Sequence, residues 1–568
     1  MSEMDKRQLI LLFIFLLPAF RSGAQTVNSD ERLRQIISRQ GQVEVTIPLG
    51  NNLSVELLTK NVSILTVKDN VVHISLSPLT VEWFILQSYD YKIIEEKISK
   101  GILSSANLKQ AMDWDIYPTY SQYDSIMRNF QKLYPALCRL DTIGTSVNGR
   151  LVLALKISDN VDIHEDEPAV FYSSTMHGDE TGGFILMLHL ADFLLKNYDT
   201  DNRVKELVDN LEIWINPLAN PDGTYTTGNT ITSPIRYNAN GFDLNRNFPD
   251  PVTPVTVKQK ETLDMVKFMR KHRFVLSANF HSGSEVVNYP WDRYLSKFHT
   301  DDAWFHSISR SYADTVHNYA GPAYMNFLEN GVTRGAVWYI VYGGRQDFIT
   351  GELQGREVTI ELDDQFVTPA SQLTLLWQNN WHSLLGYLEN ALYGIHGKVR
   401  NINSLVPVSA KVFIKGYDRD SSQVYSDSLT GSFQRFLNPG LWDLSFSATG
   451  YHDTTVTNVN LVWRQKTDLV VDMRPLINGI EPIDSSTTLI LYPNPAGNEL
   501  NALLPDVKTG NVNIKIINLT GKLISDYNTL VFQGTPLRLN INSLSSGTYI
   551  VVFKIGSASH RGRFVIVK

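Results

Sequence analysis

The pattern of apolar residues changes at Gly394, from strands alternating with helices to strands alone. Upstream of that point, strands are expected at 151–157, 169–174, 212–215, 275–280 and 358–362, and helices at 121–133, 181–195 and 258–270. This alternation over residues 115–393 predicts an α/β domain whose mixed or largely parallel central sheet is flanked by helices. Ligands of such domains bind at the carboxyl ends of the strands.

The regions on either side of this α/β domain have strand patterns. Residues 25–114 predict a small β-rich N-terminal domain, and the sequence leaves open whether this domain is a pro-segment. Residues 394–480 and 489–568 predict two small all-β sandwiches, joined by a polar linker at 481–488. A chain of 568 residues is too long for one ordinary hydrophobic core, so several domains are expected.

The first 24 residues have the pattern of a signal peptide. Lys6 and Arg7 precede a short apolar run, and Ser22-Gly23-Ala24 supplies the small residues of a cleavage site. The alternative is an uncleaved anchor, but the apolar run falls short of the roughly 20 residues of a membrane-spanning helix. No later segment has that length and character, so we expect an exported, soluble protein without a transmembrane segment.

Composition narrows the location and the partners. The chain has one cysteine, Cys138, and therefore no intramolecular disulfide, which favours a bacterial envelope or surface protein over a eukaryotic secreted one. The Cys138 side chain is expected to be a small buried apolar group. A formal net charge of -7 without a basic tract argues against a nucleic-acid partner.

Three side chains form a candidate metal site. His177 and Glu180 follow an apolar strand where a helix is expected to begin, and His281 follows another strand. The His-x-x-Glu pattern alone is common, and Glu180 alone fits a carboxylate at a helix N-terminus. Together the three supply the nitrogen and oxygen ligands typical of catalytic zinc.

Two further groups are candidates for catalysis and binding. Arg236, Asn245 and Arg246 suit the recognition of a carboxylate, although a surface turn is the alternative. Glu361 lies in a mostly apolar strand, where a carboxylate needs a partner. A general base beside a metal-bound water satisfies that need, and a buried ion pair is the alternative.

These segments resemble a known family. Residues 117–393 resemble the zinc metallocarboxypeptidases of the carboxypeptidase A superfamily, and more closely the regulatory branch typified by carboxypeptidases D, E, M and N. The matching segments are Tyr117 to Tyr120, Ile143 to Arg150, His177 to Glu180, Asn216-Pro217, Asn220 to Gly223, Asp243 to Pro249, His281, Gly335 to Asp347 and Glu357 to Leu362.

The resemblance implies a role for each matching residue. His177, Glu180 and His281 would hold one Zn²⁺ ion, and Glu361 would be the general base. Arg236 would stabilise the oxyanion. Asn245 and Arg246 would bind the free C-terminal carboxylate of a peptide or protein substrate, and Tyr339 would cover the terminal residue.

The resemblance also implies a preference for C-terminal Lys or Arg. Asp292 and Gln346 match the pocket residues of the branch that removes basic residues, and a buried carboxylate selects a cation. Neutralisation of Asp292 by Arg293 or Arg345 would remove the preference. Every expected catalytic position is intact, and the departures from the family pattern are Ser282 for Gly, Arg345 for Met and Lys260 for Pro.

The two β-modules resemble known domains as well. The segment beginning at Gly394 is similar to the transthyretin-like domain of the regulatory branch. The last module, with Leu491 to Pro495 and Gly547 to Tyr549, resembles the C-terminal sorting domains of type IX secretion cargo in Bacteroidota. The resemblance implies export through that secretion machinery to the surface or medium of a Gram-negative bacterium, and a plain adhesion module is the alternative.

Two other functions compete with the exopeptidase. A related zinc peptidase would act on cell-wall peptides, and Asn245, Arg246 and Asp292 argue against that substrate. A surface binding protein with an idle catalytic domain is a different class, and the intact metal ligands and Glu361 argue against it.

Overall fold

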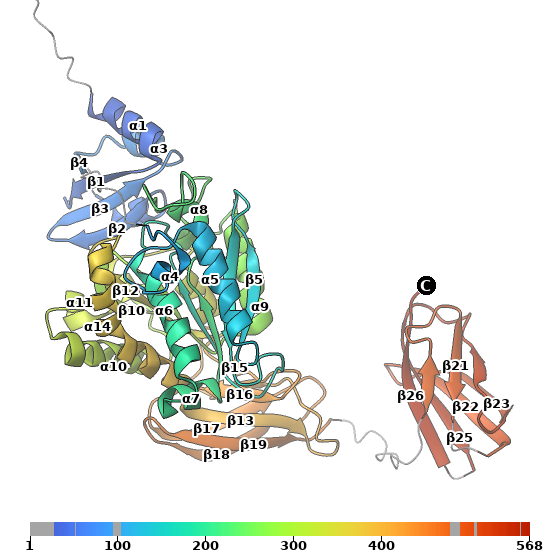
Figure 1. Cartoon of the computed structure of the whole chain (residues 1–568). Coiled ribbons are helices and arrows are strands. Elements are labelled where there is room, and N and C mark those ends of the chain that lie inside the picture. Colours follow the sequence, from blue (N-terminus) through green and yellow to red (C-terminus); the bar gives the residue numbers. More distant parts are fainter. Residues whose placement is uncertain (1–27, 51–52, 95–103, 477–488, 505–507, 557) are drawn as a thin grey trace, which may run out of the picture.

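The structure is a computed structural model and describes residues 28–50, 53–94, 104–476, 489–504, 508–556 and 558–568 (Figure 1). The predicted signal peptide (1–24) and linker (481–488) lie outside the described residues. Within the described ranges, no helix has the length and apolarity needed to cross a membrane.

The N-terminal domain is a four-stranded antiparallel sheet with helices, in the order β2-β3-β1-β4. Its elements are α1 (Ser29–Gln40), β1 (Val43–Pro48), α2 (Val55–Thr59), β2 (Ser63–Lys68), β3 (Val71–Leu76), α3 (Val81–Leu86) and β4 (Lys92–Ile94). Strand β2 is at one edge of this sheet. The expectation of a β-rich segment missed the helices. Helix α1 is amphipathic, because Leu33 and Ile37, one turn apart, enter the core.

The central domain is built on an eight-stranded mixed sheet in the order β11-β10-β12-β9-β7-β8-β6-β5. The strands are β5 (Cys138–Thr145), β6 (Leu151–Ile157), β7 (Ala169–Ser174), β8 (Glu212–Asn216), β9 (Leu276–His281), β10 (Ser284–Tyr289), β11 (Val332–Arg334) and β12 (Arg356–Asp363). The neighbours β12, β9, β7 and β8 are parallel, so their carboxyl ends meet at one edge of the sheet.

Helices cover both faces of this sheet. One core contains side chains from α5 (Tyr120–Leu133), α6 (Gly182–Asn197), α7 (Asn202–Val208), α10 (Asp302–Ala320) and α14 (Ala370–Glu389). The opposite core contains side chains from α9 (Lys260–His272) and α13 (Arg345–Glu352). The short elements are α4 (Leu108–Ala111), α8 (Pro221–Thr224), η1 (Leu244–Arg246), α11 (Phe327–Gly331), α12 (Gly335–Trp338) and η2 (Asn390–Leu392). The α/β architecture is therefore as predicted.

The core of the central domain begins before residue 115. Ala111 and Trp114, which the sequence placed in the N-terminal domain, are buried in the core shared by α5 and α6. The indole Nε1 of Trp114 donates to Asp192 Oδ2 over 3.0 Å. Residues 104–114 therefore pack with the central domain, because the aromatic side chain of Trp114 needs its apolar cover.

The two remaining parts are all-β. The first β-domain has the sheets β16-β13-β19 and β15-β14-β17-β18, and the second has β20-β21-β24 and β23-β22-β25-β26. Each has its own apolar core. The strands of the first are β13 (Gly394–Asn401), β14 (Lys411–Phe413), β15 (Val424–Tyr425), β16 (Ser432–Arg435), β17 (Gly440–Ser447), β18 (Thr454–Leu461) and β19 (Lys466–Met473). Those of the second are β20 (Ile490–Tyr492), β21 (Glu499–Leu503), β22 (Gly510–Asn518), β23 (Leu523–Val531), β24 (Leu537–Asn540), β25 (Gly547–Ile555) and β26 (Ala558–Ile566).

Candidate active site

Three predicted metal ligands converge at the carboxyl edge of the central sheet. His177 and Glu180 lie in the loop between β7 and α6, and His281 is the last residue of β9. Strands β7 and β9 are parallel neighbours, so their carboxyl ends place the three side chains together. All three are at most 3% exposed, and their ligand atoms lie within 4.8 Å of one another.

The loop that carries His177 and Glu180 is tightly constrained. A Cβ atom at Gly178 would overlap the backbone of Gly223, so only glycine fits there. Thr175 has a φ of 57°, which costs a β-branched residue on the order of 1–3 kcal/mol. Its hydroxyl donates to the carbonyl oxygen of Glu180 over 3.0 Å. This contact holds the turn that aims both ligands inward.

The donor atoms fit a zinc ion. His177 Nδ1 is 2.7 Å from Glu180 Oε1, and His281 Nδ1 is 2.7 Å from Glu180 Oε2. The two Nδ1 atoms are 3.1 Å apart. Two imidazole nitrogens and one carboxylate, with room for a fourth ligand on the cavity side, form the donor set of catalytic zinc sites.

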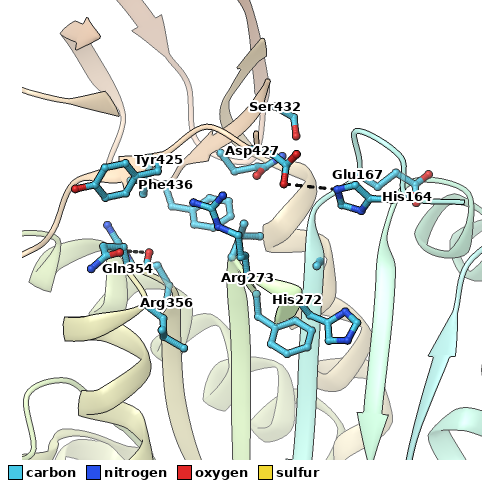
Figure 2. Close-up of a pocket in the computed structure, with 16 residues that line it drawn as sticks. His164, Glu167, His272, Arg273, Gln354, Arg356, Tyr425, Asp427, Ser432 and Phe436 are labelled. Carbon is cyan, nitrogen blue, oxygen red and sulfur yellow. Dashed lines mark hydrogen bonds and ion pairs between the residues drawn. The ribbon is translucent and has the colours of Figure 1, made fainter. Parts of the chain in front are cut away.

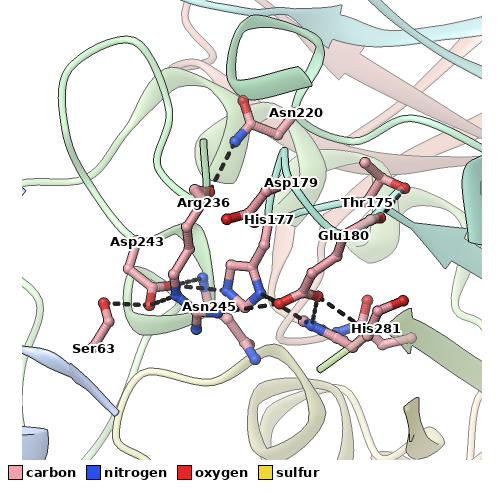
Figure 3. A network of polar contacts seen from close by, with 12 residues as sticks. Ser63, Thr175, His177, Asp179, Glu180, Asn220, Arg236, Asp243, Asn245 and His281 are labelled. Atoms are coloured by element: carbon pink, nitrogen blue, oxygen red, sulfur yellow. Dashed lines mark hydrogen bonds and ion pairs between the residues drawn. The ribbon is translucent and has the colours of Figure 1, made fainter. Parts of the chain in front are cut away.

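Asp243 and Asn279 orient the two histidines, and the sequence analysis gave neither a role. His177 Nε2 donates to Asp243 Oδ1 over 3.0 Å, which leaves the lone pair of Nδ1 facing the other ligands (Figure 3). The side-chain amide of Asn279 lies 2.6 Å from His281 Nε2. The sequence could have indicated Asn279, because residues two apart in a strand lie on the same face and Asn279 precedes His281 by two in β9.

A single cavity collects the predicted site residues. Nine of the ten line it: His177, Glu180, Arg236, Asn245, Arg246, His281, Asp292, Tyr339 and Glu361. The tenth, Gln346, is 1% exposed and contacts the cavity wall through Asp292. Sequence reasoning missed one wall residue of a different origin, Leu65, which comes from the N-terminal domain.

Glu361 lies beside a metal ligand. It pairs with His281 in the parallel register of β12 and β9, so neighbouring strands carry the two side chains. Its Oε2 atom is buried and has no hydrogen-bond partner among the described residues. Burial and the negative charge of Glu180 raise the pKa of Glu361 well above its usual range. Among the described residues Glu361 forms no ion pair, which was the alternative considered from the sequence.

Arg236 and Arg246 have different surroundings. Arg236 donates from Nε to Asp243 Oδ2 over 3.0 Å and from Nη1 to Glu180 Oε1 over 3.1 Å. Arg246 contacts only carbonyl oxygens, those of Asn245 and Ile64, at 3.0 and 3.4 Å. Its Nε atom has no partner among the described residues. A guanidinium that faces a cavity and forms no ion pair in the described ranges is suited to bind a carboxylate.

Asp292 forms the predicted pocket with Gln346. Its Oδ1 atom accepts from Gln346 Nε2 over 3.0 Å and from Asn288 Nδ2 over 3.2 Å. Gly335 lies directly against it, since a Cβ there would overlap Oδ1. Burial and the charge of Asp347 raise the pKa of Asp292 well above its usual range. Such a carboxyl group gains from a cationic ligand.

The two arginines that could have neutralised Asp292 form ion pairs with other carboxylates. Arg345 donates to Glu357 Oε2 over 2.9 Å. Arg293 pairs with Asp250 at 3.2 Å and with Asp347 at 3.4 Å. Across the described ranges, Asp292 forms no ion pair.

Tyr339 follows α12 and lines the cavity. Burial raises the pKa of its phenol to about 12, so the hydroxyl is neutral at physiological pH. Its ring packs against the apolar core of the N-terminal domain.

A second cavity lies between the central domain and the first β-domain (Figure 2). His164, Arg273, Gln354 and Asp427 are among the residues that line it. His164 Nε2 lies 3.6 Å from Asp427 Oδ2 across the domain boundary. None of the predicted site residues borders this cavity, so it belongs to the junction between the two domains.

Comparison with known proteins agrees with the geometry. Residues 123–383 match the family model of the zinc carboxypeptidases, and residues 490–567 match the model of the secretion system C-terminal sorting domain. The second match identifies the last β-domain as a sorting domain, which the sequence predicted. The metal of the family is zinc, and the donor set described above fits it.

The similar proteins include carboxypeptidase D of Homo sapiens, 35% identical over 380 residues that make up 63% of this chain and 27% of that protein. Carboxypeptidase SOL1 of Arabidopsis thaliana is 33% identical over 63% of this chain and 71% of its own length. The carboxypeptidase N catalytic chain of Homo sapiens is 32% identical over 60% and 82%. The match thus spans about a quarter of carboxypeptidase D but most of the other two. On this evidence the chain belongs to the zinc carboxypeptidase family.

Proposed function

We propose that the protein is a zinc-dependent exopeptidase that removes the C-terminal residue of peptides or proteins, with a preference for Lys and Arg. One observation carries the proposal: the Arg246 guanidinium faces the same cavity as the three metal ligands and has no anionic partner in the described ranges. A carboxylate bound there leaves the last peptide bond of the substrate near the metal site.

Asn245 and Arg246 would restrict cleavage to chain ends. A free terminal carboxylate accepts hydrogen bonds from both side chains, and an internal residue offers no such group. The phenol of Tyr339, which lines the same cavity, would cover the bound residue and exclude water.

Glu361 would move the proton. Zinc, when bound, polarises the scissile carbonyl and makes a water molecule acidic. Glu361 takes a proton from the attacking water and returns it to the leaving amine. A raised pKa suits a group that must both accept and release a proton near neutrality. The Arg236 guanidinium would stabilise the negative charge that develops on the carbonyl oxygen.

Asp292 would select basic residues. Its carboxylate lies in the cavity wall, hydrogen-bonded to Gln346 and Asn288 but without an ion pair in the described part of the chain. A Lys or Arg side chain supplies the missing positive charge. An acidic or apolar side chain leaves the carboxyl group buried without compensation.

The export route would use both ends of the chain. Residues 1–24 have the pattern of a signal peptide, and residues 490–567 match a sorting domain. We propose export through the secretion machinery that reads this tail, to the surface or medium of a Bacteroidota-like bacterium.

Hydrolysis of matched blocked peptides ending in Arg, Lys, Phe or Glu tests the activity. Chelator-sensitive release of Arg and Lys, lost in Glu361→Gln while bound zinc is retained, supports the proposal. Faster release of Phe than of Arg keeps the zinc peptidase and rejects the role of Asp292. Bound zinc without release of any residue would instead favour a binding protein.

A further inference from the structure

We propose that Asp347 positions the specificity pocket, the part of the cavity formed by Asp292 and Gln346: it holds the backbone that carries Asp292 and adds a second negative charge behind it. The inference rests on the proposed preference for basic residues and names a further residue that sets it. Asp347 is 1% exposed and does not line the cavity as far as the structure describes it. It therefore acts through Asp292 and does not touch a substrate.

The first connection runs through the backbone of Asp292. Asp347 Oδ1 accepts from the N–H of Asp292 over 3.0 Å, and Asp347 Oδ2 accepts from the N–H of Arg293 over 3.0 Å. Hydrogen bonds to a carboxylate are stronger than those between neutral groups. One buried carboxylate thus holds two consecutive peptide units, and with them the direction in which the Asp292 side chain leaves the backbone.

The second connection runs through α13. Gln346 precedes Asp347 in the first turn of this helix, and its Nε2 donates to Asp292 Oδ1 over 3.0 Å. The N-terminal turn of a helix favours a carboxylate such as Asp347, because the free backbone N–H groups there carry partial positive charge. The same turn of α13 therefore contacts Asp292 both at the backbone and at the carboxyl group.

The Asp292 carboxyl group has little freedom to adjust. A Cβ atom at Gly335 would lie 1.7 Å from Asp292 Oδ1, so the backbone of α12 closes that side of the pocket. Asn288 Nδ2 donates to the same oxygen over 3.2 Å. A shift of the Asp292 backbone would break these contacts, because the side chain has no room to compensate.

The charge of Asp347 is only partly balanced. Arg293 Nε lies 3.4 Å from Asp347 Oδ2, and Arg293 Nη1 donates to Asp250 Oδ2 over 3.2 Å. Two carboxylates therefore share one guanidinium. Burial first, and then the charge of Asp347, raise the pKa of Asp292, whereas the charges of Arg246 and Arg293 lower it. A cationic substrate side chain would relieve this surplus of negative charge.

Four elements supply the charged and titratable groups around Asp292. They are Asp347 of α13, Arg246 of η1, Glu361 of β12, Tyr339 after α12, and Arg293 next to Asp292 itself. Arg246, Glu361 and Tyr339 line the cavity and meet every substrate. Their effects cancel in the ratio of kcat/KM for an arginine-ending peptide to kcat/KM for a phenylalanine-ending one, here called the Arg/Phe ratio.

The pH profile of the Arg/Phe ratio, measured from pH 6 to pH 10 in the zinc-loaded full chain, tests the proposal. Asp347→Asn removes one charge and one of the two backbone acceptors. Arg293→Gln removes the opposite charge and leaves the Asp347 carboxylate in place. The exposed residues Asp314 and Arg128 provide the matched controls Asp314→Asn and Arg128→Gln.

Asp347→Asn is expected to change the profile in two ways. At the alkaline end, where Asp292 is ionised, the Arg/Phe ratio falls by about ten- to a hundredfold, as for a binding group displaced by about 1 Å. The midpoint of the profile moves to lower pH, because loss of the neighbouring negative charge lowers the pKa of Asp292.

Arg293→Gln is expected to move the midpoint to higher pH, since it removes a positive charge that lowers the pKa of Asp292. Both controls keep the parent profile. An alkaline ratio of Asp347→Asn equal to that of the parent would overturn the positioning role. Midpoints that do not move in opposite directions in the two variants would overturn it as well, because Asp347→Asn would then act only by disturbing the fold.

A binding measurement separates this inference from the proposed function. In a Glu361→Gln background, calorimetry with the two peptides reports binding without turnover. A preference for the arginine-ending peptide that falls in Asp347→Asn supports the role of Asp347, even if no chain hydrolyses peptides and the proposed function fails. An equal preference in the two chains, or none in either, refutes the role of Asp347, even if hydrolysis of both peptides confirms the exopeptidase.

Discussion

The guanidinium of Arg345 donates to the carboxylate of Glu357 over 2.9 Å, and both side chains are fully buried. Arg345 also lies over the ring of Phe171, 4.9 Å from its centroid. This pairing removes Arg345 from the cavity wall, although it is adjacent in sequence to Gln346, which contacts Asp292. The Asp292 carboxyl group is therefore left without an ion pair in the described ranges and can face a substrate side chain.

We expect Asp292→Asn to reverse the substrate preference. Loss of a hydrogen bond to a charged group costs about 1.5–3 kcal/mol, so kcat/KM for an arginine-ending peptide falls by about ten- to a hundredfold. The value for a phenylalanine-ending peptide stays the same or rises. Steady-state hydrolysis of the two peptides measures the ratio, and the exposed Asp314→Asn is the control. An unchanged ratio would assign selectivity to other residues.

We expect Arg246→Gln to lower kcat/KM only for substrates with a free C-terminus. Its guanidinium contacts two carbonyl oxygens and no carboxylate in the described ranges, so the variant removes binding energy for the terminal carboxylate. The kcat/KM for a free peptide falls by about ten- to a hundredfold, as for other charged hydrogen bonds.

The matching amidated peptide is the control for this variant. It is a poor substrate of the parent chain and loses nothing further in Arg246→Gln. An equal loss for both peptides would show that Arg246 supports the structure of the site and does not recognise the carboxylate.

The sequence predicted the metal site because each ligand follows an apolar strand. The expected bounds 151–157 and 169–174 coincide with β6 and β7. Parallel pairing then brings together residues that are 104 apart in sequence, His177 and His281. The apolar runs indicate where the strands lie, and the ends of the strands determine the positions of the ligand side chains.

The contact of the N-terminal domain with this site had no such signal. Ser63 is a single polar residue between Val62 and Ile64, and its hydroxyl donates to Asp243 Oδ2, 180 residues away in the sequence. No periodicity marks a pair of this kind, because the docking of two domains depends on surface shape. The helix α1 was more predictable, since Leu33, Ile36 and Ile37 have helical spacing.

We expect Asp301→Asn to loosen the joint between the central domain and the first β-domain. Asp301 accepts hydrogen bonds from Arg435 at 2.7 and 3.1 Å and from Arg356 at 2.7 and 3.1 Å. All three side chains are at most 1% exposed. Removal of one charge from such a buried group costs about 3–5 kcal/mol.

Thermal unfolding and limited proteolysis measure this loss. The variant unfolds at a lower temperature and is cut earlier near the joint, whereas the exposed Asp199→Asn is unchanged. Parent-like stability would mean that the apolar contact between Trp304 and Phe436, with ring centroids 5.2 Å apart, is sufficient to hold the domains together.

We expect the ionisation of Glu167 to lower the free energy of unfolding as the pH rises. Burial first, and then the charges of Glu165, Asp159 and Glu212, raise the pKa of Glu167 to about 8, while Lys156 lowers it. The ordinary value is 4.5. Between these two values the folded chain keeps a proton that the unfolded chain has released, so the free energy of unfolding decreases with increasing pH.

Glu167→Gln removes this dependence because its amide stays neutral. The melting temperature of the variant therefore exceeds that of the parent chain at pH 9 and approaches it at pH 4, where the parent carboxyl group is protonated in both states. Glu206→Gln, an exposed substitution on α7, leaves the pH profile of the parent unchanged. Melting curves at equal scan rates from pH 4 to pH 9 measure the difference. Parallel profiles for Glu167→Gln and the parent would mean that Glu167 is ionised in the folded protein at neutral pH.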